Sequence, residues 1–444
     1  MGRSHEGPSS AVEPTAAPAR EHPDAPTVPR LTPGLELLGR AQGSGYVEPP
    51  YLLRRGDGRV VEVSPLVHDV VLALDGQRDI AAVADHVTAR VGKRLRPEHV
   101  AFLVDQKLRP LGVVCGPKDE PASPPSHPHR PLLALTVRTA VVSRRRLRAV
   151  TTALRPLFLP PVMVGVLAAV TVLDVSLLGS HAVGGAVRQA LYDPAWLLVV
   201  AGLSVLGGGV HELGHATGAR YGGAEPGSIG LGFYLMWPVF YNDLTDAYRL
   251  GRSGRLRADV GGVYFNAVYV VVLALVYLLT GFDVLLVVIV TQHVAVLHQL
   301  LPFVRLDGYY LLCDLTGVPD LFARVRPLLA GRTRSGGRQV SLPALRPGVR
   351  AAVAAWVAVT LPVLAAGLVA FVVRAPHVLG AGHGSLRLHL HDLGRAWETG
   401  DTSLGLLSAA QLAVLAVPFV GTALLAARAL ARLVTRLAWR RTGD

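Results

Sequence analysis

Two histidines four residues apart flank a glutamate in the stretch GGGVHELGHATGARYGG, residues 207–223. On a helix, residues i and i+4 share a face, so His211 and His215 can offer ring nitrogens to one metal ion. Glu212 points about 100° away around the helix, near enough to act as general base toward a water molecule. This spacing is the HExxH arrangement, and it predicts a single bound zinc ion and hydrolysis of a peptide bond.

Zinc in a hydrolytic site needs a third protein ligand and one position left for water. Residues 195–210, just before the motif, are almost wholly apolar, and an ionisable group in or beside a bilayer costs several kcal/mol if it is unpaired, so a chance match to the motif is unlikely here. Asp307, in LLPFVRLDGYYLL (300–312), follows a later apolar segment and is the acidic residue best placed to complete the site. Asp314, seven residues further on, is the fallback.

The composition indicates a membrane protein. Of 444 residues, 51% are hydrophobic and only 17% charged, whereas soluble proteins carry about 25% charged residues. The net charge of +13 comes mostly from arginines beside apolar runs, which favours membrane topology over nucleic-acid binding. Cys115 and Cys313 are far apart in the sequence and predict no disulfide framework.

We therefore predict a mainly α, polytopic membrane helical bundle of about six spans with a small N-terminal α+β domain. Each span needs about 20 residues to cross the hydrocarbon. The predicted spans are 157–179, 195–220, 259–280, 283–304, 350–373 and 404–430. Arginine-rich segments at 143–155, 249–257, 324–346 and 428–441 are expected on the cytosolic side of a bacterial cytoplasmic membrane. Both termini and the HExxH motif then lie toward the cytosol.

The remaining segments complete the predicted organisation. Residues 1–45 lack an apolar core and are expected to be a disordered tail. Residues 46–115 combine a hairpin, YLLRR (51–55) and RVVEV (59–63), with three helical patterns, which is typical of a winged-helix-like domain. A linker and basic segment (116–156), the membrane domain (157–434, with its core near 195–320) and a cytosolic tail (435–444) follow.

HELGH on one span and LDG at the end of a later span resemble the paired signature of site-2-protease-like intramembrane zinc metallopeptidases. The longer form RLDGYYLLCDLTGVPDL (305–321) resembles the branch described as putative peptide zinc metalloproteases. The resemblance implies that His211, His215 and Asp307 bind zinc and that Glu212 is the catalytic base. GGVYFNA (261–267) resembles the family's next-span motif without its proline, so Asn266 is expected to bind substrate.

Residues 46–115 are similar in pattern to the RiPP recognition element, a domain to which a leader peptide adds as a β-strand. This implies removal of a leader during maturation of a ribosomally synthesised modified peptide, of daptide or bacteriocin type, alongside modifying enzymes or a transporter. The first alternative is regulated intramembrane proteolysis of a membrane-tethered regulator. The second is a non-catalytic membrane binding or immunity protein. His293 and His298, in the fourth span, are interpreted as polar residues facing the bundle or as partners of the metal ligands.

Overall fold

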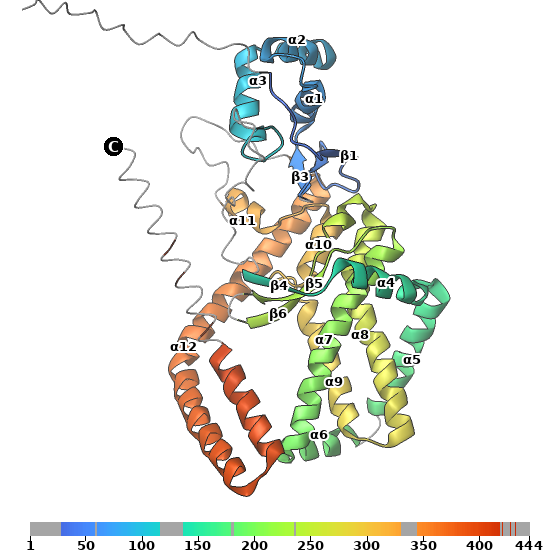
Figure 1. Ribbon diagram of the computed structural model, residues 1–444, viewed down its shortest axis with the longest axis vertical. Helices are drawn as coiled ribbons and strands as arrows, with labels where there is room; N and C mark the ends of the chain where they lie inside the picture. Colours follow the sequence, from blue (N-terminus) through green and yellow to red (C-terminus); the bar gives the residue numbers. More distant parts are fainter. Residues whose placement is uncertain are drawn as a thin grey trace, which may run out of the picture. The chain divides into compact units, whose positions relative to one another are not determined.

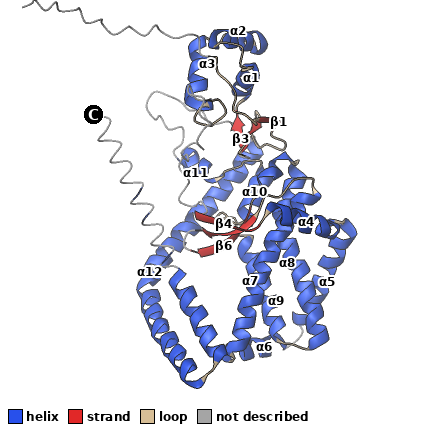
Figure 2. Ribbon diagram, viewed as in Figure 1, coloured by secondary structure: helices blue, strands red, loops and turns tan. Residues whose placement is uncertain are grey.

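The computed structural model describes residues 28–57, 60–115, 136–178, 182–234, 237–329 and 344–417, with residues 420, 427 and 431. The described chain is mainly helical, with two small antiparallel sheets (Figure 2). By its contacts the chain divides into two units, residues 1–32 with 66–125, and residues 33–65 with 126–444. Residues 1–27 of the predicted N-terminal tail (1–45), residues 116–135 of the predicted linker and basic segment (116–156) and the predicted cytosolic tail (435–444) lie outside the described residues.

The first unit consists of short helices, α1 (Pro65–Ala73), α2 (Ile80–Val91) and α3 (Pro97–Leu103), followed by a π-helical turn at Val104–Leu108. The Asp79 side chain caps α2 by accepting a hydrogen bond from the Ala82 backbone at 2.7 Å. The apolar side of each helix is buried, with Val70, Val83 and Val100 fully inaccessible to solvent. The three predicted helical patterns are therefore confirmed as helices.

The first sheet contains strands β1 (Glu36–Arg40), β2 (Tyr51–Arg54) and β3 (Val60–Val63) in that order, all antiparallel. The predicted hairpin is confirmed as β2 and β3. Strand β1 lies within the segment predicted to be disordered, and that expectation is wrong for these residues because β1 gains its hydrogen bonds from β2.

The loop after β1 is hydrogen-bonded to a later part of the second unit. The Gly45 amide donates to the Gly317 carbonyl at 2.9 Å, and the Arg346 amide donates to the Gly45 carbonyl at 2.9 Å. A Cβ on Gly45 would lie 2.2 Å from the Thr316 carbonyl oxygen. The strands thus group with the membrane helices, whereas the sequence had grouped them with α1–α3.

In the second unit, α5 (Pro160–Leu178), α7 (Pro194–Tyr221), α8 (Arg252–Thr280) and α9 (Val284–Gln299) lie side by side, with α6 (Ala182–Tyr192) linking α5 to α7 (Figure 1). A shared core holds α8 and α9 together through Leu273, Val284 and Val288, with Leu203 of α7 packed against it. A second antiparallel sheet contains the strands β4 (Thr136–Val142), β5 (Ile229–Tyr234) and β6 (Trp237–Asn242), with β5 in the middle. Strand β4 precedes α5 in the sequence, whereas β5 and β6 follow α7. The second unit also contains the helices α4 (Arg144–Leu154), α10 (Asp307–Thr316), α11 (Phe322–Leu329) and α12 (Pro347–Thr399).

Four described helices are long and apolar enough to cross a membrane: 160–177, 195–221, 252–280 and 347–374. They correspond to the first, second, third and fifth predicted spans. The fourth predicted span corresponds to the shorter helix α9. The sixth predicted span (404–430) corresponds to an apolar helix at 402–417, and the rest of that span lies largely outside the described residues. Helix α8 begins at Arg252 rather than 259, because the arginines assigned to the preceding loop favour helix and form its first turns.

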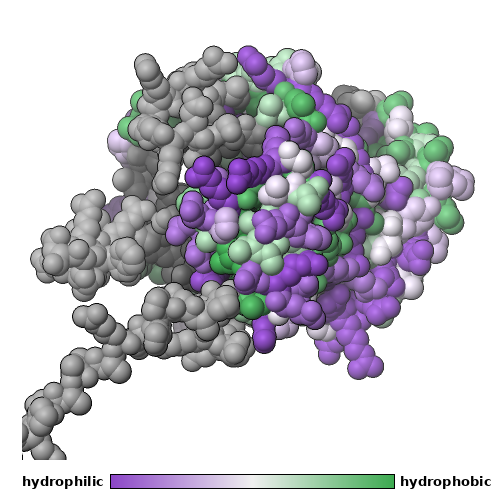
Figure 3. Space-filling model, turned by 90° about the horizontal axis from the view of Figure 1, so that it is seen from above, coloured by the Kyte–Doolittle hydropathy of each residue, from purple (hydrophilic) through white to green (hydrophobic). Residues whose placement is uncertain are grey.

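The exposed surface of the bundle suits a hydrocarbon environment. Leu278 and Leu279 of α8 are 75% and 78% exposed, and Val164 of α5 is 66% exposed. Large exposed apolar surfaces are rare on soluble monomers. Among the residues coloured in Figure 3, hydrophilic side chains predominate in the middle of the view, and hydrophobic ones lie among them and at one edge.

Helices α7 and α8 cross at a contact that only glycine permits. A Cβ on Gly214 would lie 2.2 Å from the Gly261 carbonyl oxygen, and a Cβ on Gly261 would lie 2.5 Å from the Gly214 carbonyl oxygen. The two backbones therefore approach more closely than any larger residue would allow.

We predict that Gly214→Ala lowers the stability of the detergent-solubilised protein by about 1–3 kcal/mol, because the added methyl overpacks this crossing. Thermal unfolding measures the change. The matched control is Gly209→Ala in the same helix, where a Cβ would have nothing within 4 Å. Equal unfolding temperatures for the two variants would contradict the crossing contact.

Candidate metal centre

The histidine motif forms one turn of α7. His211 and His215 are buried, at 4% and 6% exposure, and their Nε2 atoms lie 3.1 Å apart. The helix carries both rings toward α8, as the i and i+4 spacing predicts.

Asp307 is the first residue of α10, where the chain turns sharply after α9. Its Oδ2 atom lies 2.8 Å from Nε2 of His211 and 3.3 Å from Nε2 of His215. The turn depends on Gly308, because a Cβ there would lie 2.1 Å from the Leu300 carbonyl oxygen. The structure therefore brings together the two imidazoles and the carboxylate, and their ligand atoms all lie within 4.8 Å of one another.

Both imidazoles are oriented by hydrogen bonds at their other nitrogen. Nδ1 of His215 lies 2.8 Å from the Ala258 carbonyl oxygen, and Nδ1 of His211 lies 2.5 Å from Oδ1 of Asn266. Asn266 in turn donates through Nδ2 to Oε1 of Gln292 at 2.8 Å. Since a carbonyl oxygen only accepts, each ring in its neutral form carries its proton on Nδ1, which leaves the Nε2 lone pair available to a metal ion.

This donor set fits zinc. Two Nε2 lone pairs and a carboxylate oxygen are all acceptors, and no hydrogen bond satisfies the buried Oδ2 of Asp307 among the described residues. Acceptors packed this closely repel one another unless a cation lies between them. Two histidines and one carboxylate are a ligand set found in catalytic zinc sites, which leave a fourth position open.

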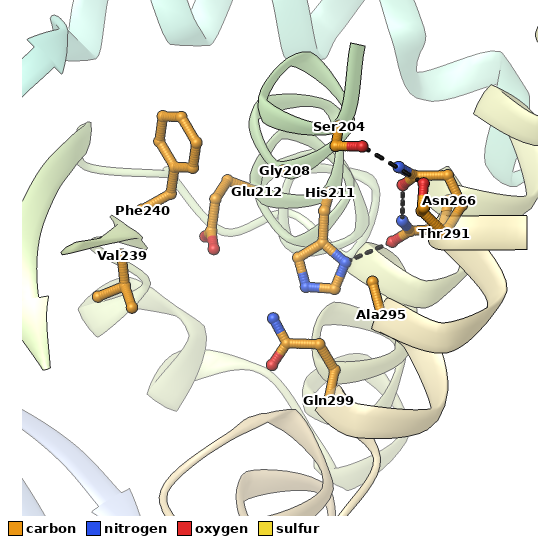
Figure 4. Close-up of a pocket in the computed structure, with 11 residues that line it drawn as sticks. Ser204, Gly208, His211, Glu212, Val239, Phe240, Asn266, Thr291, Ala295 and Gln299 are labelled. Carbon is orange, nitrogen blue, oxygen red and sulfur yellow. Dashed lines mark hydrogen bonds between the residues drawn. The ribbon is translucent and has the colours of Figure 1, made fainter. Parts of the chain in front are cut away.

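Glu212 lines a cavity of about 270 Å³ that opens beside His211. In Figure 4 its carboxylate points into the same space as the His211 ring, with Phe240 and Val239 opposite and Gln299 alongside. The cavity is also lined by Ser204, Gly208, Asn266, Thr291, Gln292 and Ala295. The Glu212 carboxylate thus faces the same cavity as the His211 ring.

One wall of this cavity is the edge of a sheet. Strand β6 pairs only with β5 among the described strands, and it contributes Val239 and Phe240 to the cavity. Asn242, the last residue of β6, donates through Nδ2 to the Glu212 carbonyl oxygen at 2.8 Å. The strand is therefore tied directly to the turn that carries the base.

The other predicted residues lie elsewhere. Asp314, the fallback ligand, accepts a hydrogen bond from Nε of Arg255 at 2.8 Å and is not in the ligand group. His293 lies 3.2 Å from Oδ1 of Asp174, and neither His293 nor His298 belongs to the ligand group. Both described cysteines are free, as predicted.

Sequence reasoning did not assign three residues that the structure brings to the site. Gln292 and Gln299 carried a usable signal, since amides inside an apolar segment are unusual unless they face a polar interior. Asn242 carried none, because its partner is a backbone carbonyl far away in the sequence. For Asn266, the contact with His211 indicates a role in orienting a metal ligand, and substrate binding stays a prediction.

Comparison with known proteins gives one relative. The chain is 27% identical over 120 residues to the putative peptide zinc metalloprotease protein YydH of Bacillus subtilis (strain 168), a match that covers 26% of this chain. The match spans 47% of YydH, about half of its length. No family model matches the chain, and no solved structure matches it.

We predict that Asn266→Ala weakens zinc binding about 10–100-fold, the range observed when a partner that orients a ligating histidine is removed. Competition with a chelator of known affinity measures the change. Thr280→Ala in the same helix is the control, because the Thr280 hydroxyl donates to the Val276 carbonyl oxygen away from the ligand group, and this variant should bind zinc like the unmodified protein. Unchanged affinity in Asn266→Ala would show that Asn266 does not orient His211.

Proposed function

We propose that the chain is a membrane-embedded zinc endopeptidase. The observation that carries the proposal is the convergence of His211, His215 and Asp307 beside a cavity that Glu212 also faces. The printed name of YydH, a putative peptide zinc metalloprotease, supports the same reaction. The four apolar helices long enough to cross a membrane support its location.

A bound zinc ion would supply polarisation of the scissile carbonyl and acidification of the attacking water. Glu212 accepts the proton that this water loses and delivers it to the leaving amine. The two imidazoles and Asp307 would hold the ion, and Asn266 and the Ala258 carbonyl orient the two rings through their Nδ1 atoms. The side chain of Gln299, which lines the cavity, can hydrogen-bond a peptide carbonyl.

The edge strand β6 favours an extended peptide as the substrate. A chain that adds to this edge gains backbone hydrogen bonds and runs alongside Glu212. An extended chain also leaves its amide groups accessible, whereas a helix hides them in its own hydrogen bonds.

The proposed substrate is the precursor of a ribosomally synthesised modified peptide, from which the enzyme removes the leader near the cytosolic face of the bacterial membrane. Both termini of the enzyme lie in the cytosol in this proposal. The basis is the similarity of residues 46–115 to a leader-binding domain. Cleavage of a membrane-tethered regulator is the second candidate, favoured by the position of the site at the end of α7, a candidate membrane span.

We predict that Glu212→Gln lowers kcat about 10²–10⁴-fold while zinc content stays unchanged, because the variant keeps all three ligands and loses only the base. Mass spectrometry of a peptide library incubated with the reconstituted protein measures cleavage, and elemental analysis measures zinc. Glu398→Gln, at an exposed position of α12, is the control. Cleavage at the unmodified rate by Glu212→Gln would rule out the proposed mechanism.

The maturation role predicts that a precursor with its leader is cut at a lower KM than the same precursor without it, because the leader adds binding energy away from the reacting bond. Equal KM values would remove this role and leave the peptidase proposal intact. Truncations used as a further test must keep residues 33–65, since Gly45 hydrogen-bonds to Gly317 and Arg346. A neighbouring gene for a short precursor would support maturation, and genes for a sigma factor and its anti-sigma factor would support the second candidate.

A further inference from the structure

Helix α4 carries a dense group of arginines that the metal centre does not use. The helix leads through a short 3₁₀ turn, Arg155–Phe158, directly into α5, whose apolar span begins at Pro160. Five exposed arginines lie within this segment: Arg144, Arg145, Arg146, Arg148 and Arg155. We call these five residues the α4 arginine face.

The charge of this face is almost uncompensated. Within the part of the chain that the structure describes, Arg148 is the one member with a carboxylate within 4.0 Å, the Glu225 Oε1 atom at 3.6 Å. That oxygen is already paired with Arg220 at 2.5 Å. A concentration of positive charge without acidic partners in the protein calls for an anionic partner outside it.

The surroundings of the face indicate a lipid surface. Clusters of four to eight basic residues next to a membrane span bind anionic headgroups. Val150 of α4 and Leu159 at the start of α5 are both 44% exposed, so apolar and cationic side chains occupy the same short segment. This combination is typical of a helix at the boundary between headgroups and acyl chains.

The opposite side of α4 packs on the helix that carries the metal ligands. Leu147 is 1% exposed and forms a small core with Ala216 of α7 and Ile229 of β5. Ala216 directly follows His215 in the sequence. Helix α4 therefore packs directly on the turn of α7 that carries His215, and Figure 1 shows it beside α7.

We propose that the α4 arginine face binds the headgroups of anionic phospholipids, and that this binding holds α4 against the His215 turn of α7. The phosphate groups supply the missing counter-charge, and the span beginning at Pro160 brings them within reach. Guanidinium groups pair with phosphate oxygens through two parallel hydrogen bonds, which suits arginine better than lysine. The lipid-binding part is independent of the proposed peptidase reaction, and the effect on α7 rests on the metal site of that proposal.

The test uses the full-length protein in nanodiscs made of phosphatidylcholine alone or of phosphatidylcholine with phosphatidylglycerol. Native mass spectrometry after partial delipidation counts retained phosphatidylglycerol. Replacing three arginines (Arg144→Gln, Arg145→Gln and Arg146→Gln together) should weaken the retention of phosphatidylglycerol roughly 100-fold. The reason is that each basic residue near an anionic surface strengthens binding roughly fivefold. High salt should weaken retention by the unmodified protein as well, because it screens exposed charges.

The matched control removes three exposed basic residues from the first unit, through Lys93→Gln, Arg94→Gln and Arg96→Gln together. It should retain phosphatidylglycerol like the unmodified protein. A further variant (Arg144→Lys, Arg145→Lys and Arg146→Lys together) should recover most of the binding, which separates loss of charge from loss of folding. Equal retention by the glutamine variant and the control would overturn the proposal, as would preferential binding of an acidic polypeptide over lipid.

The effect on α7 has its own readout. Zinc affinity, measured by chelator competition with the Glu212→Gln protein, should be several-fold higher in discs with phosphatidylglycerol than in phosphatidylcholine discs. The glutamine variant of the arginine face should lose this difference. If the Glu212→Gln protein with its arginine face intact binds zinc with the same affinity in both kinds of disc, the coupling is overturned. Because this protein does not depend on Glu212 for the measurement, the result is independent of any failure of cleavage.

Discussion

Three acceptor atoms that repel one another meet in the interior of a largely apolar bundle, and the rest of the second unit serves to hold them there. His211 and His215 present their Nε2 lone pairs, and Asp307 presents a carboxylate oxygen 2.8 Å and 3.3 Å away. Such a set is stable only around a cation, because burial without one leaves the charges uncompensated. With the neutral rings hydrogen-bonded through Nδ1 to Asn266 and the Ala258 carbonyl, their Nε2 lone pairs face the carboxylate, where a metal ion can take the place of a proton.

Close backbone contact is what makes this convergence possible. Gly214 and Gly261 let α7 and α8 touch, and a Cβ on the adjacent Gly262 would lie 2.4 Å from Nε2 of His215. Gly308 allows the chain to turn back against Leu300 so that Asp307 reaches the histidines. In a membrane, where lipid is as apolar as the helix surfaces, association depends on such tight packing and on polar contacts between helices. The same glycines therefore serve both the stability of the bundle and the geometry of the site.

Several polar side chains within the bundle hydrogen-bond to one another or to backbone carbonyl groups. The Asn266 amide bridges His211 and Gln292, Ser204 and Thr291 lie 3.3 Å apart, and the Tyr269 hydroxyl donates to the Leu203 carbonyl oxygen at 2.9 Å. These bonds connect α7, α8 and α9 at the level of the cavity. A cavity lined in part by polar side chains, next to apolar outer surfaces, offers water a place beside His211 and Glu212 while the outside of the bundle remains compatible with hydrocarbon.

The sequence by itself determined the elements that depend on local pattern. The HExxH spacing placed two imidazoles on one helical face, and the long apolar runs identified the four membrane-capable helices, since both properties follow from helix period and side-chain polarity. It also identified Asp307, because few acidic residues lie beside apolar segments. Only the tertiary structure decided which atoms the imidazoles contact at Nδ1, that Asn242 joins β6 to Glu212, and that β1 is ordered. Those contacts join residues far apart in the chain, and their energies exist only once distant segments pack, so no local pattern encodes them.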